Sequence, residues 1–418
     1  MMQVRAKAPG RANLIGEHID YSGFSVLPCA IARSVRVCAS LLPLDSEFLF
    51  IVSNQNSQFE MRNFKEIAFS AKHWSDYPLA ALCGIAAYAG RILPKMQLTI
   101  DGNIPAAAGL SSSSALVVAS ALAIAELCNV KISGVEMAQI CADSERLTGT
   151  AGGGMDQAII MLAKKNYAMH VQFVPRLLAV PVKIPGKFIA ANSLVESAKA
   201  VHATRRFNRR VLECKVAAHI LGGATLREAM YNSNKSFAEM IGIVQESLPD
   251  VILAAEIMSS PACQNLQLDT RLHEALTSAI AAGDFLHLRP RARHVYSEAA
   301  RVDQFIVSAS EDNITAMGKL MDESMQSCAQ DYDCSCPDLD QLAQLLRDAG
   351  ALGSRLTGAG WGGFVIALFP LEQKNALIAV KQVLATSYYS ERNVEELDDI
   401  VFEFEPSEGA CVIEGLDV

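Results

Sequence analysis

The sequence predicts an α+β protein of two domains, and three observations lead to this prediction. The chain has 418 residues, of which 51% are hydrophobic, so it is long and apolar enough to build two cores. Strand-like segments fill much of the first half, and helix-like segments follow them. A strand pattern then returns near the end, which is typical of an α+β fold. We place the boundary near Pro185-Gly186, which gives domains of residues 1–185 and 186–418.

The elements of the first half follow from side-chain periodicity. Val4, Ala6 and Ala8 alternate with basic residues, which predicts a strand that Pro9-Gly10 should end. Clusters of β-branched and aromatic residues predict further strands within residues 30–52 and over residues 96–100. Stretches rich in alanine and leucine predict helices over residues 77–92, 112–128 and 135–148.

The second half reads mainly as helix. Short apolar runs predict strands over residues 167–173 and 188–191, after which the pattern is helical from about Ala198 to about Gly350. A strand over residues 352–356 should then lead into a glycine-rich loop and a last strand over residues 364–369. We expect the acidic stretch 391–408 to be a solvated face or a hairpin.

Charge and composition exclude several classes of function. The chain has 36 basic and 45 acidic side chains and a formal charge of −9, which argues against nucleic-acid binding by bulk charge. Any phosphate site should therefore be local. The longest apolar run, residues 115–127, is interrupted by Ser120 and Glu126 and is too short to span a membrane. Because the N-terminus also lacks the apolar stretch of a signal peptide, we expect a cytoplasmic protein.

The cysteines fit the same expectation. Their number, eleven, is odd and their spacing suggests no disulfide framework, which is typical of thiols in a reducing compartment. The one tight pair is Cys334-Ser335-Cys336. A zinc site would need more ligands at suitable spacing, so we interpret this pair as ordinary packing.

The segment from Pro105 to Leu116 is the most informative short stretch. It contains Gly109 and four serines, Ser111 to Ser114, between a predicted strand and a predicted helix. The free N–H groups and positive end of a helix attract anions, and a serine hydroxyl in that turn can bind Mg²⁺. No Gly-Lys-Ser/Thr is present, so this is not a Walker A loop. A serine-rich helix cap without a ligand is the alternative that these residues leave open.

Two other loops carry groups suited to chemistry. Gly152-Gly153-Gly154 brings Asp156 to the start of a helix, where it is either an N-cap or a general base or substrate anchor. The stretch Arg11–Tyr21 gathers polar groups that suit a metal or, equally, the hydroxyls of a sugar. Leu14 and Ile15 should pull this stretch inward.

The late glycine loop at residues 356–364 is followed by a strand, so it is not a Rossmann fingerprint. It is either a tight turn or a loop that closes over a ligand.

Taken together, these motifs resemble those of the GHMP kinases. Residues 11–21 are similar to the galactokinase signature, residues 105–116 to the phosphate motif of the family, and residues 355–363 to its third motif. Further stretches resemble the eukaryotic branch that holds N-acetylgalactosamine kinase and plant-type galactokinases: residues 145–157, 293–301 and 334–339. The resemblance implies a two-domain fold with an N-terminal ribosomal-S5-like α/β domain and a C-terminal ferredoxin-like, helix-rich α+β domain.

The resemblance also implies an activity, an ATP- and Mg²⁺-dependent 1-kinase for galactose, N-acetylgalactosamine or both. Asp156 would take or orient the proton of the anomeric hydroxyl, and Arg11 would keep Asp156 ionised and stabilise the transferring phosphoryl group. Ser113 and Glu145 match the metal positions. The nucleotide phosphates would meet Gly109, Ser111, Ser112, Ser113 and Ser114. The sugar would meet Arg11, Glu17, His18, Asp20, Gly153 and Asp156.

One position departs from the pattern of many galactokinases. Where these carry a sugar-contacting tyrosine, the chain has Phe207, which resembles the N-acetylgalactosamine kinase branch. The loss of the hydroxyl makes room for an N-acetyl group, although one contact shifts specificity only modestly. A selective N-acetylgalactosamine kinase is therefore an alternative. A non-catalytic sugar and ATP sensor is disfavoured by the intact serine motif, and another GHMP kinase by residues 17–21.

Overall fold

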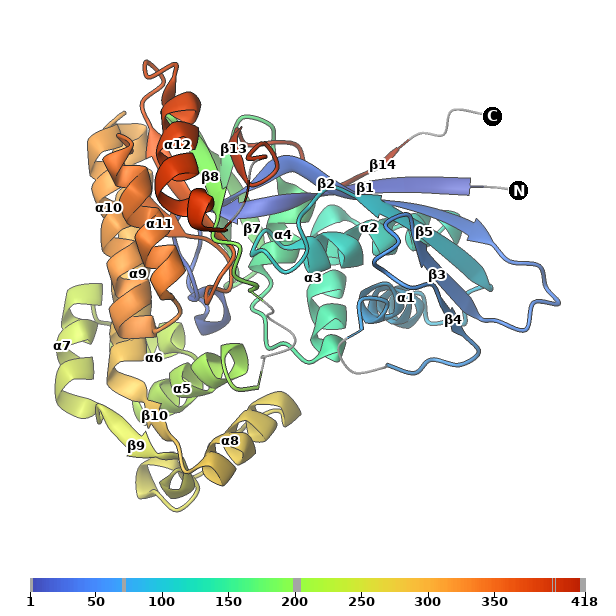
Figure 1. Cartoon of the computed structure of the whole chain (residues 1–418). Coiled ribbons are helices and arrows are strands. Elements are labelled where there is room, and N and C mark those ends of the chain that lie inside the picture. Colours follow the sequence, from blue (N-terminus) through green and yellow to red (C-terminus); the bar gives the residue numbers. More distant parts are fainter. Residues whose placement is uncertain (1–2, 70–72, 198–203, 393, 395, 414–418) are drawn as a thin grey trace.

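The computed structural model describes the chain except for residues 1–2, 70–72, 198–203, 393, 395 and 414–418. Within these described residues, two main sheets and their helices form two adjoining halves (Figure 1). This arrangement confirms the α+β prediction. The expected start of the helical region at Ala198 lies outside the described residues, and the first helix after it begins at Phe207.

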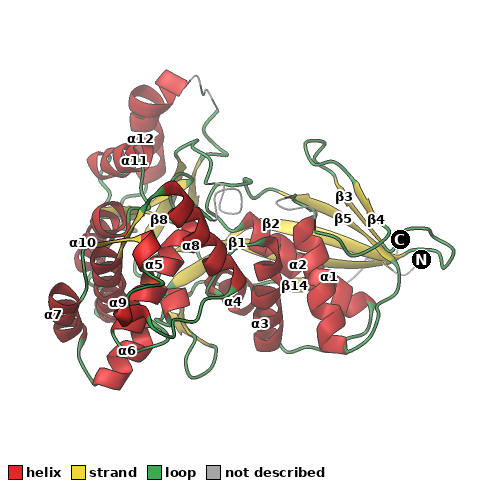
Figure 2. Cartoon of the chain, turned by 90° about the horizontal axis from the view of Figure 1, so that it is seen from below, coloured by secondary structure: helices red, strands yellow, loops and turns green. Residues whose placement is uncertain are grey.

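A six-stranded sheet forms the first half. Its strands run in the order β14 (Cys411–Ile413), β1 (Gln3–Asn13), β2 (Pro28–Leu41), β5 (Met96–Gly102), β3 (Phe50–Asn54) and β4 (Arg62–Phe64). The β3–β5 pair is parallel and the others are antiparallel. One face of the sheet is covered by helices α1 (Asp76–Ala89), α2 (Ser112–Leu127), α3 (Gly134–Glu145) and α4 (Met155–Leu162) (Figure 2). Helix α2 packs on β1 and β2, and its burial matches its apolar sequence.

The prediction that Pro9-Gly10 ends the first strand is wrong. Strand β1 continues to Asn13, and its pairing with β2 shifts register between Pro9 and Arg11. Proline has no N–H to give to the ladder, and a bulge at this point accommodates it without ending the strand. Arg11 and Asn13 therefore extend from a strand and not from a loop.

A four-stranded antiparallel sheet forms the second half. Its order is β11 (Gly353–Leu356), β12 (Phe364–Phe369), β8 (Lys187–Asn192) and β13 (Val401–Phe404). Around it lie α9 (Leu288–Ser310), α10 (Ile314–Ser327), α11 (Pro337–Asp348) and α12 (Ala376–Leu384). The stretch 391–408 is thus only partly solvated, because β13 adds to the edge of this sheet at β8 and does not form a hairpin.

Shorter elements complete the second half. The predicted helical region contains α5 (Phe207–Ile220), α6 (Leu226–Ser233), α7 (Phe237–Ser247) and α8 (Thr270–Ala282). The short antiparallel pair of β9 (Val251–Leu253) and β10 (Phe285–His287) interrupts these helices. Strands β6 (Ala168–Gln172) and β7 (Leu178–Val182), which precede this half in the chain, pair with each other and contact α4 of the first half. The last turn of α10 continues as a π-helical turn, Cys328–Tyr332, and a second such turn, Ala385–Tyr389, follows α12.

The two halves share their ends. Leu14 and Ile15 are fully buried in the same apolar cluster as α9 and β12, so the inward pull expected of them is confirmed. Strand β14 returns from the C-terminal part of the chain to pair with β1. The boundary near residue 185 stays a prediction. For function, the important point is that the segment after β1 packs against the second half.

Candidate active site

A pocket lies where three loops meet. They are the loop after β1, the glycine loop before α4, and the late glycine loop between β11 and β12. Six residues that sequence analysis assigned to the sugar site line it: Arg11, Glu17, His18, Asp20, Gly153 and Asp156. They are joined there by Tyr21, Glu145, Phe207, Gly358 and Ala359. Residues from both halves of the chain therefore form one concave site.

Arg11 and Asp156 form a buried ion pair in this pocket. Arg11 Nε lies 2.8 Å from Asp156 Oδ1, and the two residues are 4% and 8% exposed. Asp156 stands in the first turn of α4, where the helix dipole also favours a carboxylate. Arg11 Nη1 donates a second bond to the carbonyl of Gly109, at 2.5 Å. The guanidinium thus bridges the carboxylate and the serine-rich loop.

The glycine loop lets Asp20 come close. A Cβ atom on Gly153 would lie 2.5 Å from the Asp20 carboxylate, so only glycine allows this approach. Asp20 Oδ2 accepts the N–H of Met155, at 3.3 Å, and so faces the N-terminus of α4. Asn208 fixes the start of the same loop, because its amide bonds to the carbonyl of Gly149 and the N–H of Ala151.

Aromatic rings form one wall of the pocket. The ring of Phe207 lies 5.5 Å from that of His18 and 5.7 Å from that of Tyr21, measured between centroids. His18 Nε2 is 3.0 Å from the carbonyl of Ala359, and its Nδ1 is 3.0 Å from the Tyr21 hydroxyl. Both ring nitrogens of His18 therefore take part in hydrogen bonds that orient the ring.

Glu17 ties the N-terminal segment to the late glycine loop. Its Oε2 accepts from Arg355 Nη2 at 3.1 Å and from the N–H of Gly358 at 3.2 Å. Burial raises the pKa of Glu17 to about 7, against the opposing pull of the Arg355 and Arg11 charges. Although Glu17 lines the pocket, its carboxylate already serves a structural bond there.

Helix α9 holds the backbone of the same segment. Glu298 Oε1 accepts the N–H groups of Gly16 and Glu17, and His294 Nε2 donates to the carbonyl of Glu17. Desolvation lowers the pKa of the His294 ring to about 4, so at neutral pH the ring is uncharged. Burial opposes the ionisation of Glu298, but the charges of Arg301 and Arg355 and the hydrogen bond from Ser324 outweigh it and hold the pKa of Glu298 well below its usual range.

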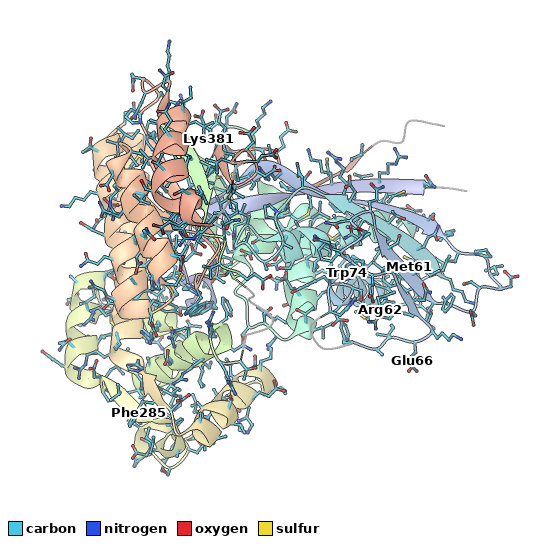
Figure 3. The ribbon with its side chains drawn as sticks, in the orientation of Figure 1. Met61, Arg62, Glu66, Trp74, Phe285 and Lys381 are labelled. Atoms are coloured by element: carbon cyan, nitrogen blue, oxygen red, sulfur yellow. The ribbon has the colours of Figure 1, made fainter. Side chains whose placement is uncertain are left out.

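A second, larger cavity of about 630 Å³ adjoins the first. Of the predicted phosphate residues, Gly109, Ser111, Ser112 and Ser113 line it. The aromatic residues Phe59, Trp74 and Tyr77 also line it, and Figure 3 labels Trp74 in the first half of the molecule. Arg11 and Asp156 belong to both cavities, so the buried ion pair lies at their junction.

The serine loop brings the N-terminus of α2 to the wall of the larger cavity. Gly109 has a φ of +81°, and a Cβ atom there would lie 2.8 Å from the carbonyl of Thr357. Ser111 stands at the N-cap of α2, and its buried hydroxyl has no hydrogen-bond partner among the described residues. Few buried polar groups in folded proteins are left without a hydrogen-bond partner. Ser114 lies behind the cavity, 3.5 Å from Asp156, so its role at the phosphates stays a prediction.

The two predicted metal positions lie together. Ser113 Oγ donates to Glu145 Oε1 at 3.1 Å, and the buried Glu145 also accepts from the amide of Gln157. Within the part of the chain that is described, no three His, Cys, Asp or Glu side chains gather as a metal site, the pair Cys334 and Cys336 included.

Several residues of the site were missed in the sequence. Tyr21, Gln157, His294 and Glu298 lie within the motifs that carry the family resemblance but were given no role, and Trp74 was not singled out. Tyr21, His294 and Glu298 each form hydrogen bonds to residues at least 277 positions away in the chain, which periodicity does not reveal.

Among the described residues, none of the helices combines the length and the apolar character needed to cross a lipid bilayer.

Comparison with known proteins identifies the family. Residues 76–164 match the family model of the GHMP kinases N terminal domain, residues 3–41 the galactokinase galactose-binding signature, and residues 305–390 the GHMP kinases C terminal domain. A galactokinase of Dictyostelium discoideum is 35% identical, with 97% of this chain and 89% of that protein covered. A galactokinase of Saccharomyces cerevisiae is 30% identical, covering 98% and 91%.

A solved structure agrees with the fold. The crystal structure of Lactococcus lactis galactokinase complexed with galactose matches with a TM-score of 0.71 at 24% identity, over 98% of this chain and 95% of that one. The predicted GHMP kinase fold is thereby confirmed. The chain belongs to the galactokinase family, whose members are ATP-dependent sugar kinases within the GHMP kinase superfamily.

Proposed function

We propose that the protein transfers the γ-phosphoryl group of ATP to the anomeric hydroxyl of galactose, N-acetylgalactosamine or both, giving the α-sugar 1-phosphate and ADP. The observation that carries this proposal is the position of Arg11 and Asp156 at the junction of two cavities. A kinase must bring a hydroxyl and a phosphoryl donor together at one such point. The names of the two relatives described above, both galactokinases, support the choice of sugar.

The smaller pocket would hold the sugar. Arg11, Glu17, His18, Asp20, Gly153 and Asp156 line it, and these are groups that exchange hydrogen bonds with hydroxyls. Asp20, which accepts the N–H of Met155, and Asp156, which pairs with Arg11, offer carboxylate acceptors in this pocket. The Phe207 ring supplies an apolar surface against which a sugar face can pack.

The larger cavity would hold ATP. Its serine loop opens α2, where the free N–H groups and the helix dipole favour phosphates, and the Ser111 hydroxyl has no hydrogen-bond partner among the described residues. The aromatic residues Phe59, Trp74 and Tyr77 suit the flat adenine ring. No basic surface is needed, which agrees with the acidic charge of the chain.

Ser113 and Glu145 fit a magnesium ion. They offer hard oxygen donors that lie within 3.1 Å of each other at the edge of the phosphate loop. Mg²⁺ is commonly held by one or two protein oxygens, with phosphate oxygens and water in the remaining positions. When bound, the ion would neutralise charge on the nucleotide phosphates.

Asp156 and Arg11 would carry the transfer itself. Asp156 would accept or orient the proton of the anomeric hydroxyl. Arg11, which contacts both Asp156 and the carbonyl of Gly109, would keep the carboxylate ionised and stabilise charge on the phosphoryl group as it moves. Positioning supplies most of the rate in phosphoryl transfer, so the rigidity of this pair matters.

Selective action on N-acetylgalactosamine is the second candidate. Phe207 supports it, because it places a ring without a hydroxyl on the wall of the sugar pocket. The similarity of residues 145–157, 293–301 and 334–339 to the N-acetylgalactosamine kinase and plant-type galactokinase branch points the same way.

A coupled ADP-release assay with ATP and Mg²⁺ tests these candidates. We expect turnover on galactose, N-acetylgalactosamine or both, and little on glucose, which differs from galactose in one hydroxyl configuration. The ratio of kcat/KM for the two galactose-configured sugars separates the two candidates. Binding of sugar and ATP without ADP release would instead support a sensor and would refute the kinase proposal.

A further inference from the structure

Tyr332 lies directly behind the sugar pocket, although it does not line it. It is fully buried, and its ring stands between two histidine rings, with centroids 4.7 Å from His18 and 4.5 Å from His294. Tyr332 ends the π-helical turn Cys328–Tyr332, and the next residue, Asp333, has a φ of +56°. π-Helical turns occur often at functional sites, where they redirect a side chain.

A chain of hydrogen bonds leads from Tyr332 into the pocket. The carbonyl of Ala359 can only accept a hydrogen bond, so His18 Nε2 bears the hydrogen and is the donor. In the neutral ring, Nδ1 then accepts from the Tyr21 hydroxyl, which in turn accepts from the hydroxyl of Tyr332. The Tyr332 oxygen lies 3.6 Å from Cys214 Sγ, which completes the chain on its far side. Each hydroxyl therefore has a defined direction.

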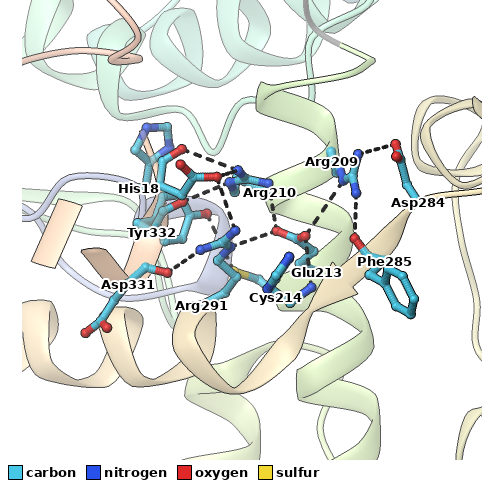
Figure 4. A network of polar contacts seen from close by, with 12 residues as sticks. His18, Arg209, Arg210, Glu213, Cys214, Asp284, Phe285, Arg291, Asp331 and Tyr332 are labelled. Atoms are coloured by element: carbon cyan, nitrogen blue, oxygen red, sulfur yellow. Dashed lines mark hydrogen bonds and ion pairs between the residues drawn. The ribbon is translucent and has the colours of Figure 1, made fainter. Parts of the chain in front are cut away.

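A buried ion cluster holds the backbone around Tyr332 (Figure 4). Glu213 is fully buried and accepts from Arg210 at 3.0 Å and from Arg291 at 2.9 Å. Arg210 Nε donates to the carbonyl of Tyr332 at 2.8 Å, and Arg291 donates to the carbonyl of Asp331. Two arginines that share one carboxylate thus fix two successive peptide units.

We propose that Tyr332 is a positioning residue for the sugar pocket, acting through Tyr21 and His18. Its hydroxyl fixes the hydrogen-bond direction of Tyr21, its ring supports that of His18, and the cluster of Glu213, Arg210 and Arg291 holds it in place. A pocket whose groups are oriented before the sugar arrives loses less entropy on binding. This inference rests on the proposed function of the pocket as the sugar site.

The test is a comparison of steady-state constants for Tyr332→Phe, which removes only the hydroxyl. We expect the KM for the sugar to rise about 3- to 10-fold, the effect of one hydrogen bond, while the KM for ATP and kcat stay within about 2-fold. Tyr389→Phe is the matched control, because Tyr389 is also fully buried, ends the other π-helical turn and donates its hydroxyl to the carbonyl of Asn192. It should leave the KM for the sugar unchanged.

A double-variant comparison separates positioning from general loss of structure. Because Tyr332 acts through Tyr21, the variant Tyr21→Phe/Tyr332→Phe should show no larger rise in sugar KM than Tyr21→Phe alone. Arg210→Lys keeps the charge and removes the Nε–H donated to Tyr332, so it should give the same selective rise even if Tyr332→Phe folds poorly.

The outcomes distinguish this inference from the proposed function. An unchanged sugar KM in Tyr332→Phe, additive losses in the double variant, or equal rises in the KM for sugar and ATP would overturn the inference while the wild-type protein stays active. A wild-type protein that phosphorylates neither galactose nor N-acetylgalactosamine would overturn the proposed function, and the inference with it.

Discussion

Arg11 Nε donates a hydrogen bond of 2.8 Å to Asp156 Oδ1, and the two residues are 145 positions apart in the chain. Strand β1 carries the arginine and the first turn of α4 carries the aspartate. The pair is buried at the wall shared by two cavities, so its charges are poorly screened by solvent. This arrangement puts a fixed carboxylate and a fixed cation at the point where a sugar hydroxyl and a phosphate would meet.

We predict that Asp156→Asn lowers kcat by a factor of about 10² to 10⁴, the usual contribution of a general base. The amide keeps the shape of the carboxylate, so sugar binding measured by calorimetry should persist. ADP release measures the turnover. Asp322→Asn is a control, since Asp322 pairs with Arg347 at 3.2 Å outside both cavities. Near-normal turnover of Asp156→Asn would refute its proposed role.

The magnesium requirement should change when Glu145 is altered. Glu145→Gln keeps the hydrogen-bonding shape but removes a charge that hard cations prefer, so we expect the Mg²⁺ concentration for half-maximal rate to rise about tenfold or more. Initial rates over a Mg²⁺ series at fixed ATP measure this. Glu136→Gln, an exposed residue of the same helix α3, should leave the Mg²⁺ dependence unchanged. Equal dependence in the two variants would speak against a metal at Ser113 and Glu145.

The contact between the late glycine loop and the serine loop should be intolerant of a side chain. A Cβ atom on Gly358 would lie 2.3 Å from the carbonyl of Gly109, and Gly358 has a φ of +89°. Gly358→Ala should therefore lower the free energy of unfolding by well over 2 kcal/mol and raise the KM for ATP. Gly90→Ala isolates the backbone effect, because Gly90 has a φ of +61° and open space around it; it should lose only about 1–2 kcal/mol. Urea unfolding and ATP kinetics check both, and similar losses in the two variants would contradict the prediction.

His294 should make the protein sensitive to mild acid. The unfolded chain protonates this histidine near pH 6.5, whereas burial lowers its pKa in the folded protein to about 4. Between these values the unfolded state binds more protons, so the free energy of unfolding falls as the pH falls, by about 3 kcal/mol from this group alone. The charged groups that act on the ring are Glu298, Arg301 and Asp331.

His294→Gln tests this linkage, because glutamine keeps an N–H for the carbonyl of Glu17 but does not titrate. Urea unfolding at several pH values from 7 to 4 should show a shallower decline than in the wild-type protein. His273→Gln removes an exposed histidine of α8 and should leave the decline unchanged. If His294→Gln kept the full wild-type slope, the assignment of this pH dependence to His294 would be wrong.

The local elements of the fold were predictable, and its long-range contacts were not. The helices predicted over residues 77–92 and 112–128 correspond to α1 and α2. Their composition alone indicates a helix within one short stretch of sequence, without knowledge of any distant contact. Strand β13 was missed because Val401, Phe402 and Phe404 stand among acidic residues, and only pairing with β8 reveals them as an edge strand. Pro9 suggested a strand end, which the bulge before Arg11 avoids.

In the site, too, the residues within local motifs were predictable and the long-range contacts were not. Motif resemblance led to Arg11, Asp156 and the serine loop, and the structure brings them together. The supporting residues have no local signature. Tyr332 and Glu298 act on the loop after β1 from more than 280 residues away, through packing and hydrogen bonds that depend on the whole fold. Their roles could only be inferred once the chain was folded.

Phe207 gives the last prediction, which concerns the choice of sugar. Its ring lies on the wall of the sugar pocket against His18 and Tyr21. Phe207→Tyr adds a hydroxyl, which fills space and offers a bond to a sugar hydroxyl. We expect kcat/KM for N-acetylgalactosamine to fall relative to galactose by about tenfold, the low end of what a single pocket contact contributes. Phe24→Tyr is the matched control, since Phe24 has the same 6% exposure but packs against Phe237 and Tyr296. A ratio that moves equally in both variants, or toward N-acetylgalactosamine in Phe207→Tyr, would show that this ring does not determine which sugar fits.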